Sequence, residues 1–200
     1  MTPGTYDLIV IGCSLGGMRA LQSIFKAFPD DFVTPIAVAQ HRHKQSNEEL
    51  PAFLKRATKY CVVDVEDKQQ IEPRCVYLAP ADYHLLVERG RFSLSTEAAV
   101  AYSRPSIDVL FESAADAYRQ RLIGVILTGA NNDGARGVQR IKQQGGVVIV
   151  QDPATAEAPA MPQAAISTSS VDRILPLDRV GPFLVEVCRA ASPLTTPARQ

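Results

Sequence analysis

The chain has 200 residues, and its 21 basic side chains balance 21 acidic ones, so no strong field favours nucleic acid or an anionic membrane. The length suits one α/β domain with a large core and is too short for two full domains. No apolar run approaches the roughly 20 residues that span a bilayer, and no signal-peptide pattern opens the chain, so we expect a cytoplasmic protein with no nucleic-acid partner and no membrane insertion.

A strand, a glycine-rich turn and a helix are predicted at the start of the chain. The apolar run 8–11 leads into Gly12-Cys13-Ser14-Leu15-Gly16-Gly17, and a helical stripe of apolar residues follows at once. Ser14 is thereby placed at the carboxyl end of the first strand and at the start of the first helix.

Three interpretations of this turn stay open on its residues alone. A dinucleotide fingerprint requires a bare glycine where Ser14 stands, and the acidic residue expected after the next strand is missing, since that strand ends in Ala39-Gln40-His41. A G-x-S-x-G nucleophile elbow matches Gly12, Ser14 and Gly16, although its serine does not normally follow the first strand of a chain. In the third interpretation Ser14 only caps the helix, and the glycines allow close packing.

Strands and helices continue to alternate after this turn. We expect strands at 35–39, 61–65, 122–127 and 147–150, and helices at 46–57, 106–118, 135–144, 162–167 and 180–191. Apolar strands in a βαβ rhythm predict a doubly wound, mostly parallel sheet with helices on both faces. The rhythm breaks over about 76–95, where 84–88 and 91–95 alternate in polarity and predict an antiparallel hairpin, so we interpret this stretch as an excursion at one side of the sheet.

Polar side chains follow three of the predicted parallel strands, namely Ser14, His41 and Asp133. The carboxyl ends of parallel strands meet at one edge of a sheet, so these side chains can converge. A serine hydroxyl becomes a nucleophile when an imidazole takes its proton, and the imidazole needs a carboxylate behind it. The pattern therefore indicates acyl transfer, with backbone N–H groups around Ser14 and at Gly129–Asn131 suited to stabilise an oxyanion.

Simpler interpretations of the histidines remain. His41 could be a surface residue at a strand end, and His43 could be the base in its place. The two could also belong to a metal site, although no clear third ligand accompanies them and we expect no metal. His84 lies in the predicted hairpin and is expected to be structural.

The acids and cysteines have alternatives as well. Asp133 could be the N-cap of the helix that follows it, and Asp152 and Asp108 are rival acids. The cysteines stand far apart without a Cys-x-x-Cys pair, which is typical of small buried residues in a reducing compartment. Cys13 lies beside the candidate nucleophile, so we expect it to be the thiol that an alkylating reagent reaches.

Several blocks of the sequence, taken in order, resemble the catalytic domain of bacterial chemotaxis protein-glutamate methylesterase (CheB-type). They are IGCSLGG at 11–17, AQH at 39–41, VYLAPADYHLLV at 76–87, RPSIDVLFESAA at 104–115, LTGANNDGARG at 127–137, GGVVIVQDP at 145–153 and AMPQAAI at 160–166. The resemblance implies one catalytic domain over 1–191, and the Pro- and Thr-rich composition from Ser192 onward predicts a disordered tail over 192–200. The phospho-receiver domain of the family does not stand before the first strand, which begins near Asp7. We therefore expect either a free-standing catalytic domain, with a separate receiver protein as a candidate regulator, or a part of a longer chain.

The activity that the resemblance implies is hydrolysis of γ-glutamyl methyl esters on the cytoplasmic helices of chemoreceptors, releasing methanol, with glutamine deamidation by the same chemistry and no cofactor. Ser14, His41 and Asp133 match the nucleophile, base and acid of the family. The positions of its oxyanion and site loops are occupied here by Leu15, Gly16, Gly129, Ala130 and Asn131.

Three departures from the family pattern bear on rate and substrate choice. Leu15 stands where the family usually has Thr, Ala130 where it usually has Met, and Arg42-His43 where it often has an apolar residue and Pro. An esterase or amidase with the same mechanism and another substrate is therefore an alternative function, and a non-catalytic receptor-binding signalling domain is a second.

Overall fold

The computed structural model describes residues 6–41, 49–100 and 102–190. The predicted start of the second helix at 46–48, the rival base His43 and the tail over 192–200 lie outside the described residues. None of the helices within the described ranges is long and apolar enough to cross a membrane.

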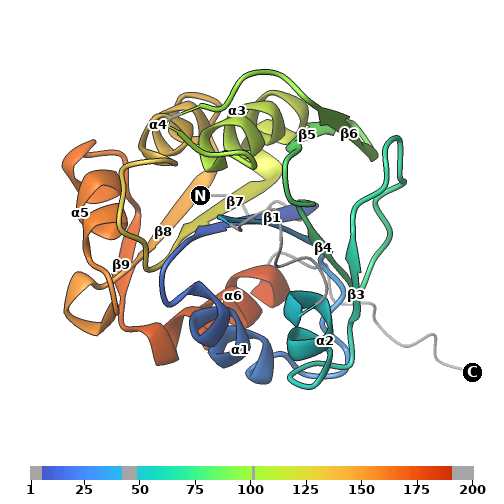
Figure 1. Cartoon of the computed structure of the whole chain (residues 1–200). Helices are drawn as coiled ribbons and strands as arrows, with labels where there is room; N and C mark the ends of the chain where they lie inside the picture. The colour runs from blue at the N-terminus through green and yellow to red at the C-terminus, as the bar shows by residue number, and fades with distance from the viewer. Residues whose placement is uncertain (1–5, 42–48, 101, 191–200) are drawn as a thin grey trace, which may run out of the picture.

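A seven-stranded sheet forms the centre of the molecule (Figure 1). Its strands lie in the order β3-β4-β2-β1-β7-β8-β9, and every neighbouring pair is parallel. The bounds are β1 (Leu8–Cys13), β2 (Ile36–Gln40), β3 (Cys61–Asp64), β4 (Cys75–Leu78), β7 (Leu122–Ile126), β8 (Val147–Gln151) and β9 (Arg173–Leu175). The predicted doubly wound, mostly parallel sheet is confirmed.

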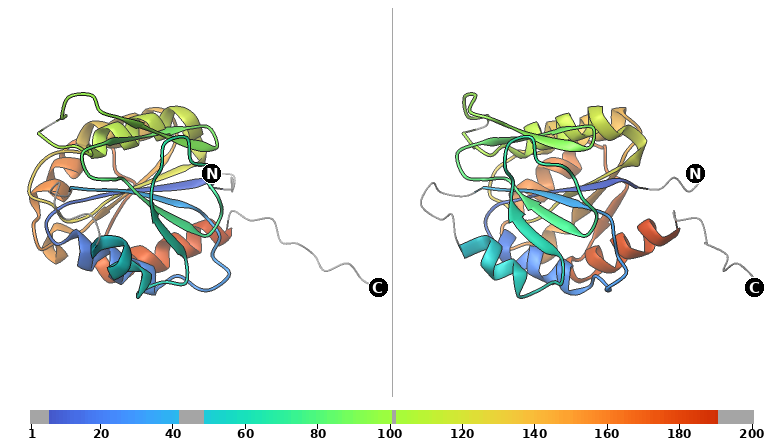
Figure 2. Two further views of the ribbon diagram at one scale, coloured as in Figure 1. Left: turned by 45° about the vertical axis from the view of Figure 1, so that its right-hand side comes forward. Right: turned by 90° about the vertical axis from the view of Figure 1, so that its right-hand side faces the viewer.

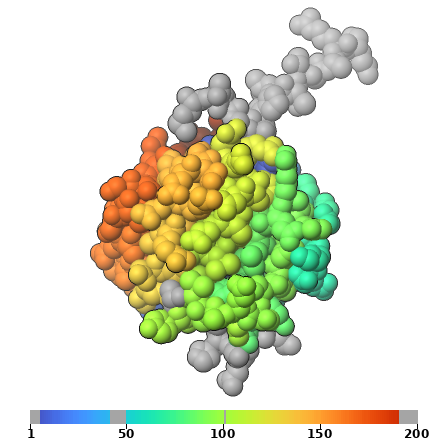
Figure 3. Space-filling view, turned by 90° about the horizontal axis from the view of Figure 1, so that it is seen from above, coloured from blue at the N-terminus to red at the C-terminus, as the bar shows by residue number. Residues whose placement is uncertain are grey.

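Helices cover both faces of the sheet, as the two side views show (Figure 2). On one face lie α1 (Gly17–Lys26), α2 (Glu49–Lys55) and α6 (Leu177–Ala190). The other face is covered by α3 (Ile107–Tyr118), α4 (Ala135–Gln143), α5 (Ala160–Ser167) and the antiparallel hairpin of β5 (His84–Glu88) and β6 (Arg91–Ser95). Figure 3 shows α3, α4 and the hairpin side by side over this face.

The alternation of side chains along β1 explains why both faces need cover. Ile9 and Ile11 belong to the core cluster shared with α1 and α6, whereas Leu8 and Val10 belong to the cluster shared with α3 and α4. Successive side chains of a strand point to opposite faces, so a strand that is apolar at every position must be buried on both sides.

Two strands differ from the sequence-based expectation. Residues 75–78 form β4 and pair with β3 and β2 inside the main sheet, so the excursion is only the hairpin that follows. The prediction was wrong there because β4 follows β3 without an intervening helix and breaks the βαβ rhythm. β9 was not predicted either, because it is an edge strand of only three, largely exposed residues.

Candidate active site

The register of the central strands places Ser14 and His41 next to each other. Cys13 and Gln40 are paired at the carboxyl ends of β1 and β2, and the N–H of His41 donates to the carbonyl of Cys13 at 3.2 Å. The N–H of Ser14 donates to the carbonyl of Thr128, which follows β7, at 2.9 Å. The backbone hydrogen bonds between these parallel strands thus continue one residue beyond the strand ends. They hold the loops that follow β1, β2 and β7 together at one edge of the sheet.

Both side chains lie on the face of the sheet that α3 covers. A Cβ added to Gly12 would stand 2.3 Å from Cγ2 of Ile107, so the absence of a side chain lets the start of α3 approach β1. Ser14 comes two residues after Gly12, and His41 two residues after Ala39, which lies in the α3 cluster. The period of two therefore directs Ser14 and His41 toward the start of α3.

Asp133 reaches the same place from the loop between β7 and α4. Its Oδ2 lies 2.8 Å from Nε2 of His41, with the carboxylate fully buried and the imidazole 13% exposed. The structure therefore brings together a base candidate and an acid candidate that are far apart in the sequence.

The carboxylate of Asp133 also caps a helix, but not the one that the sequence suggested. It accepts hydrogen bonds from the N–H of Ile107 at 2.7 Å, the N–H of Asp108 at 2.9 Å and the hydroxyl of Ser106 at 2.9 Å, at the start of α3. The N-cap of α4, which follows Asp133 in sequence, is Gly134 with a φ of 99°. The interpretation of Asp133 as the cap of the following helix is therefore wrong, because its side chain turns back to α3.

These contacts keep Asp133 ionised. Burial by itself would raise the pKa of this carboxyl, but the hydrogen bond from His41 and those from the N–H groups of Asp108 and Ile107 outweigh burial and hold the pKa below its usual value. A buried carboxylate with this many donors is rigid as well as charged.

The second ring nitrogen of His41 faces polar groups from two other segments. Nδ1 lies 3.4 Å from Nδ2 of Asn131 and 3.5 Å from Oγ of Ser103. The Oδ1 of Asn131 accepts from the N–H of Asp133 at 3.2 Å, which directs the amide nitrogen to the ring. With Nε2 donating to the carboxylate of Asp133, Nδ1 carries the lone pair, so the neutral imidazole can act as a base there.

Two of the backbone N–H groups expected to stabilise an oxyanion are already used. Ser14 donates to Thr128, and Gly129 donates to the carbonyl of Ala158 at 2.9 Å. The expectation that these two N–H groups stabilise an oxyanion is wrong, because both donate to carbonyl groups of neighbouring loops. Thr128, which sequence reasoning missed, adds a side-chain link: its Oγ1 donates to the carbonyl of Leu15 at 2.9 Å and accepts from the N–H of Ala158 at 2.8 Å.

Other N–H groups of the same loops remain available. Among residues 6–41, 49–100 and 102–190, no acceptor takes a hydrogen bond from the N–H of Leu15, Gly16 or Ala130. Gly16 is the N-cap of α1 with a φ of 81°, a backbone conformation that glycine adopts without strain. The positive end of the helix dipole adds to the attraction of this turn for negative charge.

The comparisons with known proteins agree with this geometry. The family model described as CheB methylesterase matches residues 9–184. The chain belongs to the CheB methylesterase family. Its members are hydrolases of methyl esters, so the chain is a methylesterase by family.

Relatives of this methylesterase cover most of the chain. A Leptospira interrogans protein, named a candidate protein-glutamate methylesterase/protein-glutamine glutaminase, is 44% identical over 183 residues, which are 91% of this chain and 95% of that protein. The Myxococcus xanthus protein-glutamate methylesterase FrzG is 39% identical over 93% of this chain and 57% of its own length. The crystal structure of the Thermotoga maritima CheB methylesterase catalytic domain superposes with a TM-score of 0.87 at 33% identity, over 92% of this chain and 99% of that one.

The rival residues of this methylesterase have structural partners elsewhere. The ring of His84 is buried, with Nδ1 accepting from the N–H of Ser106 at 3.2 Å and Nε2 lying 3.1 Å from the carbonyl of Ala98. Asp152 caps a short 3₁₀ turn after β8. Asp108 accepts from the N–H of Gly137 at 2.8 Å, and burial, the largest cause, raises its pKa.

Cys13 is not the accessible thiol that the sequence suggested. It is fully buried beneath α1, and burial raises its pKa to about 12. The expectation that an alkylating reagent would reach it is wrong, because the side chain of this position alternates away from Ser14 into the core. Among the described residues, no group of three or more His, Cys, Asp and Glu side chains could hold a metal ion.

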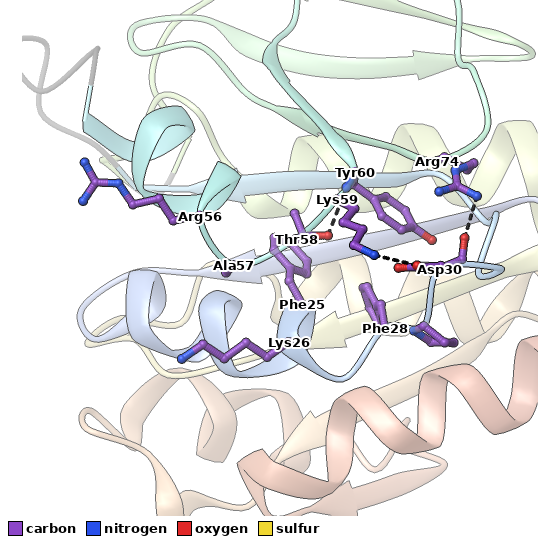
Figure 4. Close-up of a pocket in the computed structure, with 11 residues that line it drawn as sticks. Phe25, Lys26, Phe28, Asp30, Arg56, Ala57, Thr58, Lys59, Tyr60 and Arg74 are labelled. Atoms are coloured by element: carbon purple, nitrogen blue, oxygen red, sulfur yellow. Dashed lines mark hydrogen bonds and ion pairs between the residues drawn. The ribbon is translucent and has the colours of Figure 1, made fainter.

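A cavity of about 290 Å³ lies at the opposite edge of the methylesterase, next to the end of α1 and the starts of β3 and β4 (Figure 4). Nζ of Lys59 donates to the carboxylate of Asp30 there at 2.6 Å, and the guanidinium of Arg74 donates to the carbonyl of Asp30 at 2.5 Å. The candidate active site therefore does not coincide with this cavity and lies on the loops at the carboxyl edge.

Proposed function

We propose that this chain hydrolyses the methyl esters of protein glutamyl side chains, with Ser14 as nucleophile, His41 as base and Asp133 as the acid that orients it. The observation that carries the proposal is the 2.8 Å contact of Asp133 with Nε2 of His41, which leaves the lone pair on Nδ1, beside the amide of Asn131, to take a proton at the edge where Ser14 lies.

In the first step Oγ of Ser14 attacks the ester carbonyl while its proton passes to Nδ1 of His41. The buried negative charge of Asp133 stabilises the imidazolium that results. The oxyanion of the tetrahedral intermediate is held by the unengaged N–H groups of Leu15, Gly16 and Ala130. His41 then returns the proton to the leaving methoxide, and methanol departs from an acyl-Ser14.

Water completes the cycle by the same route in reverse. His41 takes a proton from water as it attacks the acyl-Ser14 carbonyl, and returns it to Oγ of Ser14 as the bond between Oγ and the acyl carbon breaks. The glutamyl carboxyl group is released, and Ser14 and His41 are restored. With a glutamine side chain the leaving group is ammonia in place of methanol, which accounts for both activities in the names of the relatives.

The substrate that this site suits is the surface of another protein. Leu15 at the oxyanion turn is 56% exposed, and Tyr102, next to Ser103, is 104% exposed. Exposed apolar side chains beside the site favour contact with a protein surface over enclosure of a small molecule. We propose methylated cytoplasmic helices of chemoreceptors as that surface, encountered in the cytoplasm, with a separate receiver protein as the regulator.

Replacement of Ser14 tests the proposal directly. We expect Ser14→Ala to lower the rate of methanol release from a methylated receptor by roughly 10⁴-fold or more, as for the loss of other triad nucleophiles. Ser23→Ala, a serine of α1 outside the site, is the matched control and should keep the full rate. Unchanged methanol release by Ser14→Ala would refute the assignment of the nucleophile.

A panel of simple methyl esters and amides separates the substrate from the mechanism. Ala130 and Leu15, which replace the usual Met and Thr, are the features that favour a same-mechanism enzyme with another substrate. Rapid turnover of small esters with none of methylated receptor would support that alternative, and binding of receptor without any turnover would support a non-catalytic domain.

A further inference from the structure

Two of the four cysteines, far apart in the sequence, are neighbours in the sheet. Cys61 is the first residue of β3 and Cys75 the first of β4, and their Cα atoms are paired in register on these parallel strands. The N–H of Cys61 donates to the carbonyl of Arg74 at 3.1 Å, which fixes the two strand starts against each other. The sequence-based interpretation of the cysteines as buried residues is wrong for this pair, because Cys61 is exposed and Cys75 is half-buried.

The distance between paired strands suits a covalent link. Neighbouring strands lie roughly 4.8 Å apart, and a disulfide joins residues whose Cα atoms are roughly 4.4–6.8 Å apart. Residues in register share a face of the sheet, so the side chains of Cys61 and Cys75 lie on the same side. Burial raises the pKa of the Cys75 thiol, a hydrogen bond with Tyr77 lowers it and the nearby Cys61 thiol raises it.

Exposure separates this pair from the other thiols. Cys61 is exposed and Cys75 is half-buried, whereas Cys13 and Cys188 are buried. A reagent in solution can therefore reach Cys61, and Cys75 stands behind it as a resolving thiol. β3 is the last strand at its end of the sheet, so no further strand shields it on that side.

We propose that Cys61 and Cys75 form a reversible redox site that takes small-molecule disulfides such as oxidised glutathione. The Cys61 thiolate attacks one sulfur of glutathione disulfide, a mixed disulfide forms and one glutathione leaves. The Cys75 thiolate then attacks the Cys61 sulfur, and the second glutathione leaves. The protein dithiol loses two electrons and two protons, and one glutathione disulfide becomes two glutathione thiols.

The product is a cross-link that ties the edge strand β3 to β4. An exposed disulfide between directly paired residues belongs to the labile, regulatory class rather than to the inert structural class. The site lies at the amino ends of its strands, at the edge opposite Ser14, and is independent of the proposed function.

The test incubates the folded chain with glutathione disulfide, blocks the remaining thiols with iodoacetamide and maps the peptides by mass spectrometry without reduction. We expect a single linked pair of peptides that contain Cys61 and Cys75, the loss of two titratable thiols, and recovery of both when reduced glutathione is added. Cys188→Ser is the control and should form the same link.

The single variants show whether Cys75 resolves the adduct. Cys75→Ser should stop at a stable glutathione adduct on Cys61, and Cys61→Ser should react at least about tenfold more slowly because the remaining thiol is half-buried. A wild-type chain that stops at the same glutathione adduct, forms a dimer through Cys61, or shows no reaction at Cys61 would overturn the proposal.

Discussion

At the scale of single residues, Asp133 connects catalysis to the stability of the fold. One carboxylate accepts from the imidazole of His41 and from the start of α3. The base and the helix are therefore held by one buried charge, and a substitution at Asp133 affects both.

Asp133→Asn separates the charge of this residue from its shape. The amide oxygen can still accept from α3, but it cannot favour the imidazolium of His41, and the amide nitrogen favours the wrong tautomer of the ring. We expect kcat for methanol release to fall roughly 10⁴-fold, with the circular dichroism of the wild type. A decrease of less than about tenfold would contradict the role given to Asp133.

Asn131 is a positioning residue for His41 in this account. Its amide donates toward Nδ1 while its oxygen holds the N–H of Asp133. Asn131→Ala should lower kcat roughly 5-fold, the value of one neutral hydrogen bond of about 1 kcal/mol, with KM unchanged. Asn132→Ala, at the neighbouring exposed position, is the control. An equal decrease of kcat in both variants would contradict a positioning role for Asn131.

At the scale of elements, the pairing of the Asp133 loop with α3 makes stability depend on pH. The pKa of Asp133 is lowered in the folded state, so the ionised form stabilises the fold above the unfolded pKa, and this contribution is lost as pH falls through the folded pKa. Asp108, at the start of α3, has a raised pKa, so its effect on stability has the opposite pH dependence. Its contribution to the unfolding free energy is present below its unfolded pKa and is lost as pH rises through the folded pKa.

Urea unfolding of two variants measures these contributions separately. The loss of unfolding free energy in Asp133→Asn should be larger at pH 7 than at pH 3. For Asp108→Asn the dependence should be reversed: the unfolding free energy of the variant should increase relative to that of the wild type as pH rises. A pH-independent difference between wild type and Asp133→Asn would show that its carboxylate carries no such linkage.

At the scale of the whole molecule, most of the architecture could be predicted from the sequence. A short apolar run such as 122–127, followed by a glycine-rich polar loop, favours a strand that is buried on both faces of a sheet. β4 and β9 could not be foreseen, because β4 lacks a preceding helix and β9 has only three, largely exposed residues. Both depend on contacts with the rest of the sheet.

The candidate site could likewise be predicted only in part. The polar residues that follow buried strands, Ser14 and His41, could be selected from the sequence because strand ends converge. Ser103, which lies beside His41, and Ser106, which donates to Asp133, could not, because these contacts cross tens of residues and depend on where α3 begins. Thr128 likewise shows its role only when the loops it joins are seen together.

Covalent labelling by a fluorophosphonate tests the central claim most directly. Its phosphorus takes the place of the ester carbonyl carbon, so an activated serine forms a stable adduct with loss of fluoride. We predict that mass spectrometry finds the adduct on Ser14 in the wild type, and that His41→Ala slows its formation at least about 100-fold, the lower range for loss of general-base help. Labelling of another residue, or of Ser14 at the same rate without His41, would contradict the account.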